Sequence, residues 1–215
     1  MQTKTVLRMS AGIVASCVAG VAAAGVTNLI VNGDFEDPTL TGIHSDYEHT
    51  PGGNFDDGTW WVSPWDPGLP WAGWQATPFG VAAMNINGDA SPQAGNRRVW
   101  FQTVSVEPGL EYRFSAWMLA TAAGPDGYSL EFAFDGTVLG GVQTPEFSFE
   151  WRSFETFLVP MSDSVTISIV DISGAWFPND FMLDDISLVA VPSPAAGLLL
   201  LPAGIVTRGR RRRCG

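Results

Sequence analysis

Two pairs of carboxylates occupy two short stretches near opposite ends of the chain. Near the start, an apolar run ends in a turn that carries Asp34 and Glu36, in the sequence NLIVNGDFE. Near the end, a strand-like stretch carries Asp184 and Asp185, in the sequence NDFMLDDISLV, although aspartate is a poor strand former. If the two stretches are neighbouring strands of one sheet, the four acids converge, and oxygen ligands of this kind suit Ca²⁺. The other interpretation is that these acids are solvated strand ends.

Tryptophan offers a second kind of chemistry, because a flat indole can stack on the apolar face of a pyranose ring. Five of the nine tryptophans lie between Thr39 and Gly80, where the sequence has no regular period and many turn-forming residues. A loop of this length in a compact domain is often functional. The loop residues that we expect to be partly exposed and to contact a ligand are Trp60, Trp61, Trp65, Trp71 and Asp66. The other interpretation is that these tryptophans pack within the loop.

Two further tryptophans are candidates for the same ligand. Along the expected strand 110–119, alternation places Arg113, Ser115 and Trp117 on one face, opposite an apolar face that predicts a core. A cation, a hydroxyl and an indole side by side suit either a polar ligand or an ordinary solvated surface. Trp176 lies in the loop before the last strand, where it could cover the same surface or plug the end of the fold.

The spacing of apolar residues predicts the fold class. Short stretches with alternating apolar residues are separated by turn signals about every ten residues, and helix signals are absent from the central region. We therefore expect an all-β chain folded as an antiparallel β-sandwich. The two cysteines, Cys17 and Cys214, lie in the terminal segments, so no disulfide framework supports this domain.

Three blocks, in this order, resemble the galactose-binding-domain-like superfamily of secreted carbohydrate-binding modules: NLIVNGDFE, FQTVSVEPGLEYRFSAW and NDFMLDDISL. The resemblance covers residues 28–189 and implies a jelly roll, commonly with a structural calcium and a sugar site built from aromatic residues. The implied calcium ligands are Glu36 and Asp184, with Asp34 and Asp185 as second choices. Because adjacent strand residues point to opposite faces, we expect only one of the two neighbouring aspartates to bind the ion.

The start of the chain has the pattern of an export signal. Residues 1–24 combine a basic beginning, an apolar middle and small residues before Gly25, which predicts a signal peptide. The alternative is a lipobox that ends at Cys17 and would make this cysteine a lipidated N-terminus. Under either interpretation the chain leaves the cytoplasm, and the sandwich domain spans residues 25–190.

Residues 191–215 combine a proline motif, a short apolar run and an arginine cluster. This order resembles the bacterial PEP-CTERM sorting signal, with Ser193 at the place where glutamate is usual. The resemblance implies that envelope sorting and processing machinery acts on the segment and that the protein reaches the cell surface or the extracellular matrix. Because arginines after an apolar run stop translocation at the inner side of a membrane, we expect residues 195–206 to be a transient membrane anchor.

The charge of the central region excludes one class of partner. All 22 acidic residues lie between Asp34 and Asp185, and only four basic residues lie in the same range, which gives this region a net charge of −18. Such a field repels phosphate backbones and attracts cations. Nucleic acid is therefore not an expected partner.

The expected function is binding without catalysis. His44 and His49 flank two acids and could bind a metal, but exposed loops also favour these residue types. The central region has none of the common nucleophile or zinc motifs, and nothing in the sequence fixes the separation of a catalytic carboxylate pair. We expect a domain that binds an extracellular polysaccharide with the support of calcium. The alternatives are a structural surface or matrix protein without a defined sugar ligand, and a glycan hydrolase.

Overall fold

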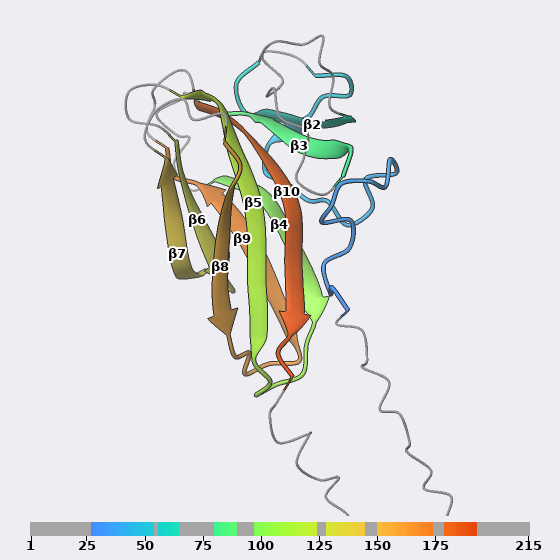
Figure 1. Cartoon of the computed structure of the whole chain (residues 1–215), viewed down its shortest axis with the longest axis vertical. Helices are drawn as coiled ribbons and strands as arrows, with labels where there is room; N and C mark the ends of the chain where they lie inside the picture. The colour runs from blue at the N-terminus through green and yellow to red at the C-terminus, as the bar shows by residue number, and fades with distance from the viewer. Residues whose placement is uncertain are drawn as a thin grey trace, which may run out of the picture.

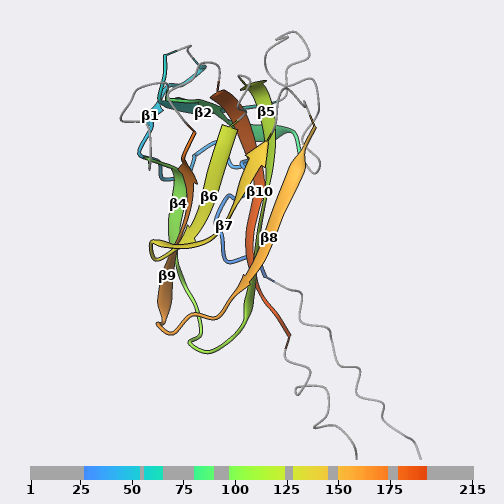
Figure 2. The ribbon, with the colours of Figure 1, turned by 90° about the vertical axis from the view of Figure 1, so that its left-hand side faces the viewer.

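The protein folds as a sandwich of two β-sheets, as the computed structural model shows in two views (Figures 1 and 2). The structure describes residues 27–53, 56–64, 80–89, 97–123, 128–144, 150–173 and 179–192, and these contain strands and loops but no helix. The prediction of an all-β antiparallel sandwich is confirmed. Within the described ranges there is no helix of the length and apolarity that a membrane span requires. The predicted signal peptide and the predicted membrane anchor, residues 195–206, lie outside the described residues.

The larger sheet has six strands and the smaller sheet has four. The order in the larger sheet is β1 (Glu48–His49), β2 (Thr59–Pro64), β3 (Ala82–Asn87), β10 (Asn179–Ala190), β5 (Tyr112–Ala123) and β8 (Arg152–Leu158). The order in the smaller sheet is β4 (Arg97–Ser105), β9 (Ser164–Asp171), β6 (Tyr128–Phe134) and β7 (Thr137–Thr144). Every neighbouring pair is antiparallel except β1 and β2.

The core lies between the two sheets and follows the predicted alternation. On β5 the side chains of Phe114, Ala116 and Met118 are fully buried, whereas Ser115 and Trp117 on the other face are only partly buried. Across the sandwich, the ring of Phe132 on β6 stacks on Phe154 of β8 with centroids 3.9 Å apart. Because removing apolar area from water drives folding, these inner faces fix which surface of β5 remains open to solvent.

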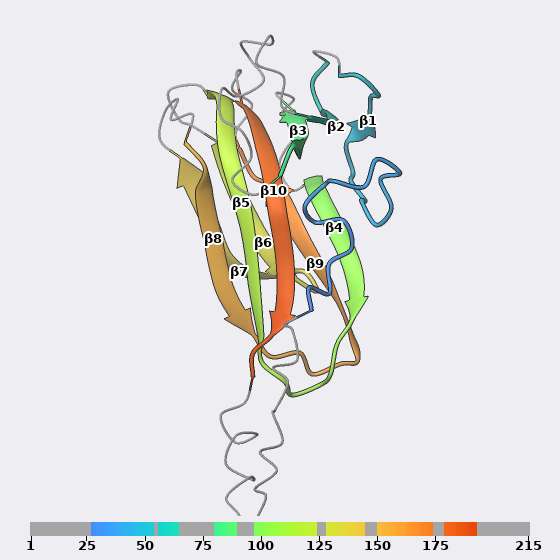
Figure 3. The same cartoon turned by 45° about the vertical axis from the view of Figure 1, so that its right-hand side comes forward.

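The predicted neighbourhood of the first and last stretches is confirmed, but the first one is not a strand. Residues 28–37, which we call the N-terminal segment, form turns, and they lie along β10 with β4 on the other side (Figure 3). Two backbone hydrogen bonds join the segment to β10, from Leu29 N to Leu188 O at 2.9 Å and from Ile186 N to Gly33 O at 2.8 Å. The side chain of Asn28 adds bonds to Leu188 N and Ile186 O, at 2.9 and 3.1 Å.

The N-terminal segment does not form a strand because side chains, and not a neighbouring strand, form hydrogen bonds with its backbone N–H and C=O groups. Gln102 of β4 accepts a hydrogen bond from Val31 N at 2.8 Å and donates to Val31 O at 3.0 Å and Gly42 O at 2.7 Å. Asn32 and Phe35 also have positive φ angles, of 54° and 56°, which a strand does not accept. The segment therefore bridges β4, the edge strand of the smaller sheet, and the part of β10 beyond its pairing with β3, instead of adding a strand to either sheet.

Strand β10 contains a β-bulge at its two aspartates. Its pairing with β5 shifts register between Asp184 and Ser187, and Asp185 has a φ of +48°. Leu183 and Ile186 both belong to the core although they are three residues apart. A bulge inserts an extra residue and resets the alternation of faces. The bulge removes the strict alternation on which the separation of Asp184 from Asp185 was based, so the expectation that only one of them binds an ion stays a prediction.

Candidate functional site

A groove of about 530 Å³ lies where the N-terminal segment meets the outer face of β5 and β10. We call it the Trp117 groove. Trp117 and Ser115 come from β5, Asp185 and Ser187 from β10, and Asp34 from the N-terminal segment. The register explains this arrangement, since Ser187 is paired with Ser115 and Asp184 with Trp117. The predicted open face of the strand at 110–119 is thus one wall of a cavity.

The amides that border the groove serve the scaffold. Asn28 accepts hydrogen bonds from Ile30 N and Leu188 N and donates one to Ile186 O. Asn32 donates to Asp37 O at 3.1 Å and accepts from Asp37 N at 2.9 Å. In each of the two side chains, both the amide oxygen and the amide nitrogen therefore have a backbone hydrogen-bond partner. The remaining polar side chains of the groove are two carboxylates and two serine hydroxyls.

The carboxylates at the groove repel one another. Burial raises the pKa of the Asp185 carboxyl, and the nearby charges of Asp34 and Glu36 raise it further. The Oδ2 atom of Asp185 is buried and has no hydrogen-bond partner within the described part of the chain. Glu36 is held in place because its Oε1 accepts hydrogen bonds from Val81 N at 2.7 Å and Ala82 N at 3.0 Å. Asp34 and Asp185 thus line the same groove, whereas the convergence of all four acids stays a prediction.

The predicted calcium site fits this arrangement in its donor chemistry. Asp184 is 1% exposed, and its Oδ1 accepts a hydrogen bond from Asp185 N at 2.8 Å. Carboxylate oxygens are a donor type that Ca²⁺ prefers, although Asp34 and Glu36 are exposed. However, among the described residues no three side chains of Asp, Glu, His or Cys lie close enough together to hold an ion on their own. Calcium binding by Glu36, Asp184, Asp34 or Asp185 therefore stays a prediction.

The loop tryptophans divide into different environments. Trp60 is only 6% exposed, lies in β2 as part of the core, and contacts the ring of His49 at 4.4 Å between centroids. The expectation that Trp60 is partly exposed is wrong, because β2 pairs with the buried strand β3 and turns this side chain inward. Trp61 is half-buried against Gly53, where an added Cβ would come within 2.9 Å of the indole. Neither residue lines the Trp117 groove.

The other predicted ligand contacts cannot be placed. Trp65, Asp66, Trp71 and Trp176 lie outside the described residues. Of the seven predicted ligand-binding residues, the structure therefore brings only Trp117 into a described cavity, and there it meets the predicted metal-binding residues Asp34 and Asp185.

The two histidines do not form a metal site with their neighbours. The ring of His44 stacks on Phe101 with centroids 5.5 Å apart, and His49 lies against Trp60. Asp46 between them is bonded through both carboxylate oxygens to Arg98, at 2.9 Å each. Arg98 holds the pKa of Asp46 below its usual range. In the described part of this loop, the side chains point to different partners, which does not support the metal hypothesis.

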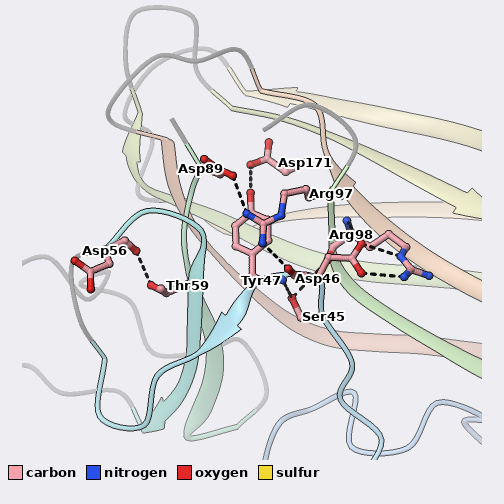
Figure 4. A network of polar contacts seen from close by, with 9 residues as sticks. All are labelled: Ser45, Asp46, Tyr47, Asp56, Thr59, Asp89, Arg97, Arg98 and Asp171. Carbon is pink, nitrogen blue, oxygen red and sulfur yellow. Dashed lines mark hydrogen bonds and ion pairs between the residues drawn. The ribbon is translucent and has the colours of Figure 1, made fainter. Parts of the chain in front are cut away.

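Sequence reasoning missed a polar network at one end of the sandwich (Figure 4). Tyr47 donates a hydrogen bond to Oδ2 of Asp171 at 2.8 Å, although the two residues are 124 positions apart. Arg97 lies over the ring of Tyr47 at 4.4 Å and forms an ion pair with Asp89 at 2.7 Å. Burial raises the pKa of both Asp171 and Tyr47. This network joins the loop at residues 45–47 to the ends of β3, β4 and β9, so its evident role is structural.

Asp180, at the start of β10, is a further, partly buried acid at this end of the sandwich. Burial raises the pKa of Asp180 to about 6, with a further contribution from Asp57, although a hydrogen bond from Gly88 N opposes the shift. The neighbouring Asn179 is 1% exposed and packs so closely on Gly88 that an added Cβ there would lie 2.3 Å from the amide. These contacts make the glycine at position 88 a steric requirement.

Comparisons with solved structures establish the class of fold. A cyclase from Fischerella sp. TAU is similar over 78% of this chain and 98% of its own, with 16% identity and a TM-score of 0.57. The Stig cyclase Fisc from Fischerella sp. TAU covers 78% of this chain and 99% of its own, with 15% identity and a TM-score of 0.56. At this identity, both similarities establish a shared β-sandwich fold and no activity.

A weaker similarity connects the chain to a carbohydrate-binding module. TmCBM61, in complex with β-1,4-galactotriose, covers 77% of this chain and 99% of its own, with 16% identity and a TM-score of 0.48. No family model matches the chain, and no curated protein matches it significantly. The function must therefore be argued from the site itself.

Proposed function

We propose that the domain binds a glycan without catalysing a reaction, and that the Trp117 groove is its binding site. The observation that carries the proposal is the combination in one cavity of an indole, two hydroxyls and two carboxylates, Trp117, Ser115, Ser187, Asp34 and Asp185. A pyranose ring has an apolar C–H face and an edge of hydroxyl groups. The indole suits the face, and the hydroxyls and carboxylates suit the edge.

The position of the groove on the sheet also favours binding. Trp117 and Ser115 lie on a strand in the interior of a six-stranded sheet, and their backbone is fixed by β10 on one side and β8 on the other. A preorganised surface loses little conformational entropy when a ligand binds. The predicted loop contacts Trp65, Asp66, Trp71 and Trp176 remain part of the proposal as additional contacts.

Calcium is proposed as a structural support of this site. The ion would be held by Glu36 and Asp184, with Asp34 and Asp185 as the second choices, and it would supply positive charge at the point where these acids repel one another. The repulsion between Asp185, Asp34 and Glu36 supports this proposal. The ion would thereby hold the N-terminal segment against the bulge of β10.

Export to the cell surface is the proposed setting of this activity. Residues 1–24 are proposed to direct export, and residues 191–215 to be recognised by the sorting machinery, with residues 195–206 as a transient membrane anchor. A glycan ligand then belongs to the extracellular polysaccharide. The sequence patterns support this proposal.

The test is glycan binding by the full chain and by two variants. Trp117→Ala removes the proposed platform, whereas Phe157→Ala removes another aromatic side chain that is 53% exposed on the neighbouring strand β8. A glycan array identifies a ligand, and titration calorimetry then measures the loss of affinity. We expect at least a tenfold loss for Trp117→Ala and little change for Phe157→Ala, with both variants folded by circular dichroism.

Three results would contradict the proposal in different ways. If Trp117→Ala binds the glycan as well as the unaltered chain does, the ligand site lies elsewhere. If the chain binds no glycan with calcium or with EDTA, the alternative of a structural surface protein is favoured. Release of reducing sugar from a bound glycan would show the third alternative, a hydrolase.

A further inference from the structure

We propose that the Trp117 groove prefers a glycan that carries free, protonated amino groups over neutral or acidic glycans. This inference rests on the proposed function, because it names the ligand class of the same groove. Two observations support it: the negative charge of the groove, and the carboxylates of Asp34 and Asp185, which are free to accept hydrogen bonds from a ligand.

The groove is lined by negative charge. Asp34 and Asp185 line it from two sides, and no lysine or arginine is among the described residues that line it. The nearest arginine along the strand is Arg113, two residues before Ser115, and it forms an ion pair with Glu155 at 3.4 Å. An acidic sugar would therefore meet carboxylates without a local cation, whereas an ammonium group would meet complementary charge.

The unused hydrogen-bonding groups also favour a donor-rich ligand. Side-chain amides can donate and accept hydrogen bonds at once, but Asn28 and Asn32 each already use at least one donor and one acceptor on the backbone. The carboxylates of Asp34 and Asp185 can only accept. An ammonium group offers three donors and no acceptor, so it matches these carboxylates better than a hydroxyl or an acetamide does.

The net negative charge of the whole domain also favours a positively charged glycan. Between Asp34 and Asp185 the chain has 22 acidic and four basic residues. Even if one Ca²⁺ is bound, the four carboxylates proposed as its ligands exceed its charge by two. A polymer with repeated positive charges is attracted to such a surface, and a polymer of uronic acids is repelled. Local contacts and long-range attraction therefore select the same class of glycan.

The experiment compares two probes that differ only at nitrogen with a third that is acidic. Calorimetry at 0.15 M salt measures the affinity of the full chain for a β-1,4-linked glucosamine oligosaccharide, for its fully N-acetylated form of the same length, and for an oligogalacturonate. We expect the free amine to bind at least tenfold more tightly than the acetylated form, and the oligogalacturonate to show no binding.

Matched lysine substitutions separate the groove from the net charge. Ser187→Lys places a cation inside the groove, and Ser105→Lys places the same charge on the exposed surface of β4. Neither residue is a proposed calcium ligand. We expect Ser187→Lys to abolish the preference for the free amine and Ser105→Lys to retain it. Thermal unfolding of both variants confirms that they are folded.

Three results would overturn this inference. Equal affinity for the free and acetylated probes, with a loss on Trp117→Ala, would leave a glycan-binding groove without selection for amines. Equal effects of Ser187→Lys and Ser105→Lys would show that the preference is a property of the whole surface. Binding of neither probe would exclude this ligand class, and the glycan array would then decide the proposed function separately.

Discussion

Gln102 is the residue whose removal most directly tests how the N-terminal segment is held. This side chain is 5% exposed and makes three hydrogen bonds to the segment and the following turn, of 2.8, 3.0 and 2.7 Å. Gln102→Leu keeps the approximate volume but removes all three bonds. Since each hydrogen bond contributes about 1 kcal/mol net, the variant should lose about 3 kcal/mol of unfolding free energy.

The loss can be measured by urea unfolding and by thermal unfolding. For a chain of this size, about 3 kcal/mol corresponds to a decrease of roughly 6–12 °C in Tm. Thr103→Val is the matched control, because it is the next residue on β4, is exposed, and loses a single hydroxyl contact of 2.7 Å with Thr166. It should change stability by no more than about 0.5 kcal/mol.

The result that refutes the reasoning is a loss for Gln102→Leu that is no larger than the loss for Thr103→Val. The N-terminal segment would then be held mainly by its contacts with β10, and Gln102 would not contribute. Hydrogen exchange adds a second readout, because the amide of Val31 donates to Gln102 and should exchange faster in the leucine variant, whereas the amide of Leu29 donates to Leu188 O and should not.

Three further predictions concern the acids. Asp184→Ala should lower Tm in calcium but not in EDTA, since bound ligand stabilises only the folded state; an equal decrease in both buffers would exclude the calcium role. Asp180 keeps its proton in the folded state up to about pH 6, whereas the unfolded chain releases it near 3.8, so folding stability falls as pH rises between these values. Asp180→Asn should therefore raise stability above pH 6, by up to about 3 kcal/mol, and urea unfolding at pH 4 and 7 should show no gain at the lower pH. Tyr47→Phe should cost about 1–3 kcal/mol in urea unfolding, because the buried Asp171 loses a donor, and an unchanged midpoint would contradict the proposed network.

The sequence predicted those features that depend on local alternation. On β5, the period of two correctly separates buried Phe114 and Met118 from the outer Ser115 and Trp117, because β5 itself is regular there and the extra residue opposite it belongs to β10. The approach of the first and last stretches was a hypothesis suggested by the acids that both carry, because the pattern within a stretch does not specify its neighbour. These patterns suffice for the fold class and for one wall of the groove.

The remaining features depend on contacts between distant residues, which no local pattern contains. The burial of Trp60 results from the pairing of β2 with β3, in which Trp60 lies opposite Ile86. The turn conformation of the N-terminal segment results from Gln102, which is 71 positions away from Val31. A polar residue within the apolar alternation of β4 was the available signal for this contact, but its partner could not be identified from the sequence.

The bulge in β10 explains why the groove, the acids and the N-terminal segment form one unit. Without the bulge, the alternation from Leu183 would direct Ile186 away from the core, and the backbone at residue 186 would not be placed to bond Gly33 O and the Asn28 side chain. The extra residue therefore returns Ile186 to the core and gives Asp185 its positive φ beside Asp34. Two adjacent aspartates are unfavourable in a regular strand, and aspartate is among the residues that best tolerate a positive φ. The aspartate at position 185 is thus explained by the backbone there, and replacing it by glycine should preserve the fold while removing one acidic wall of the groove.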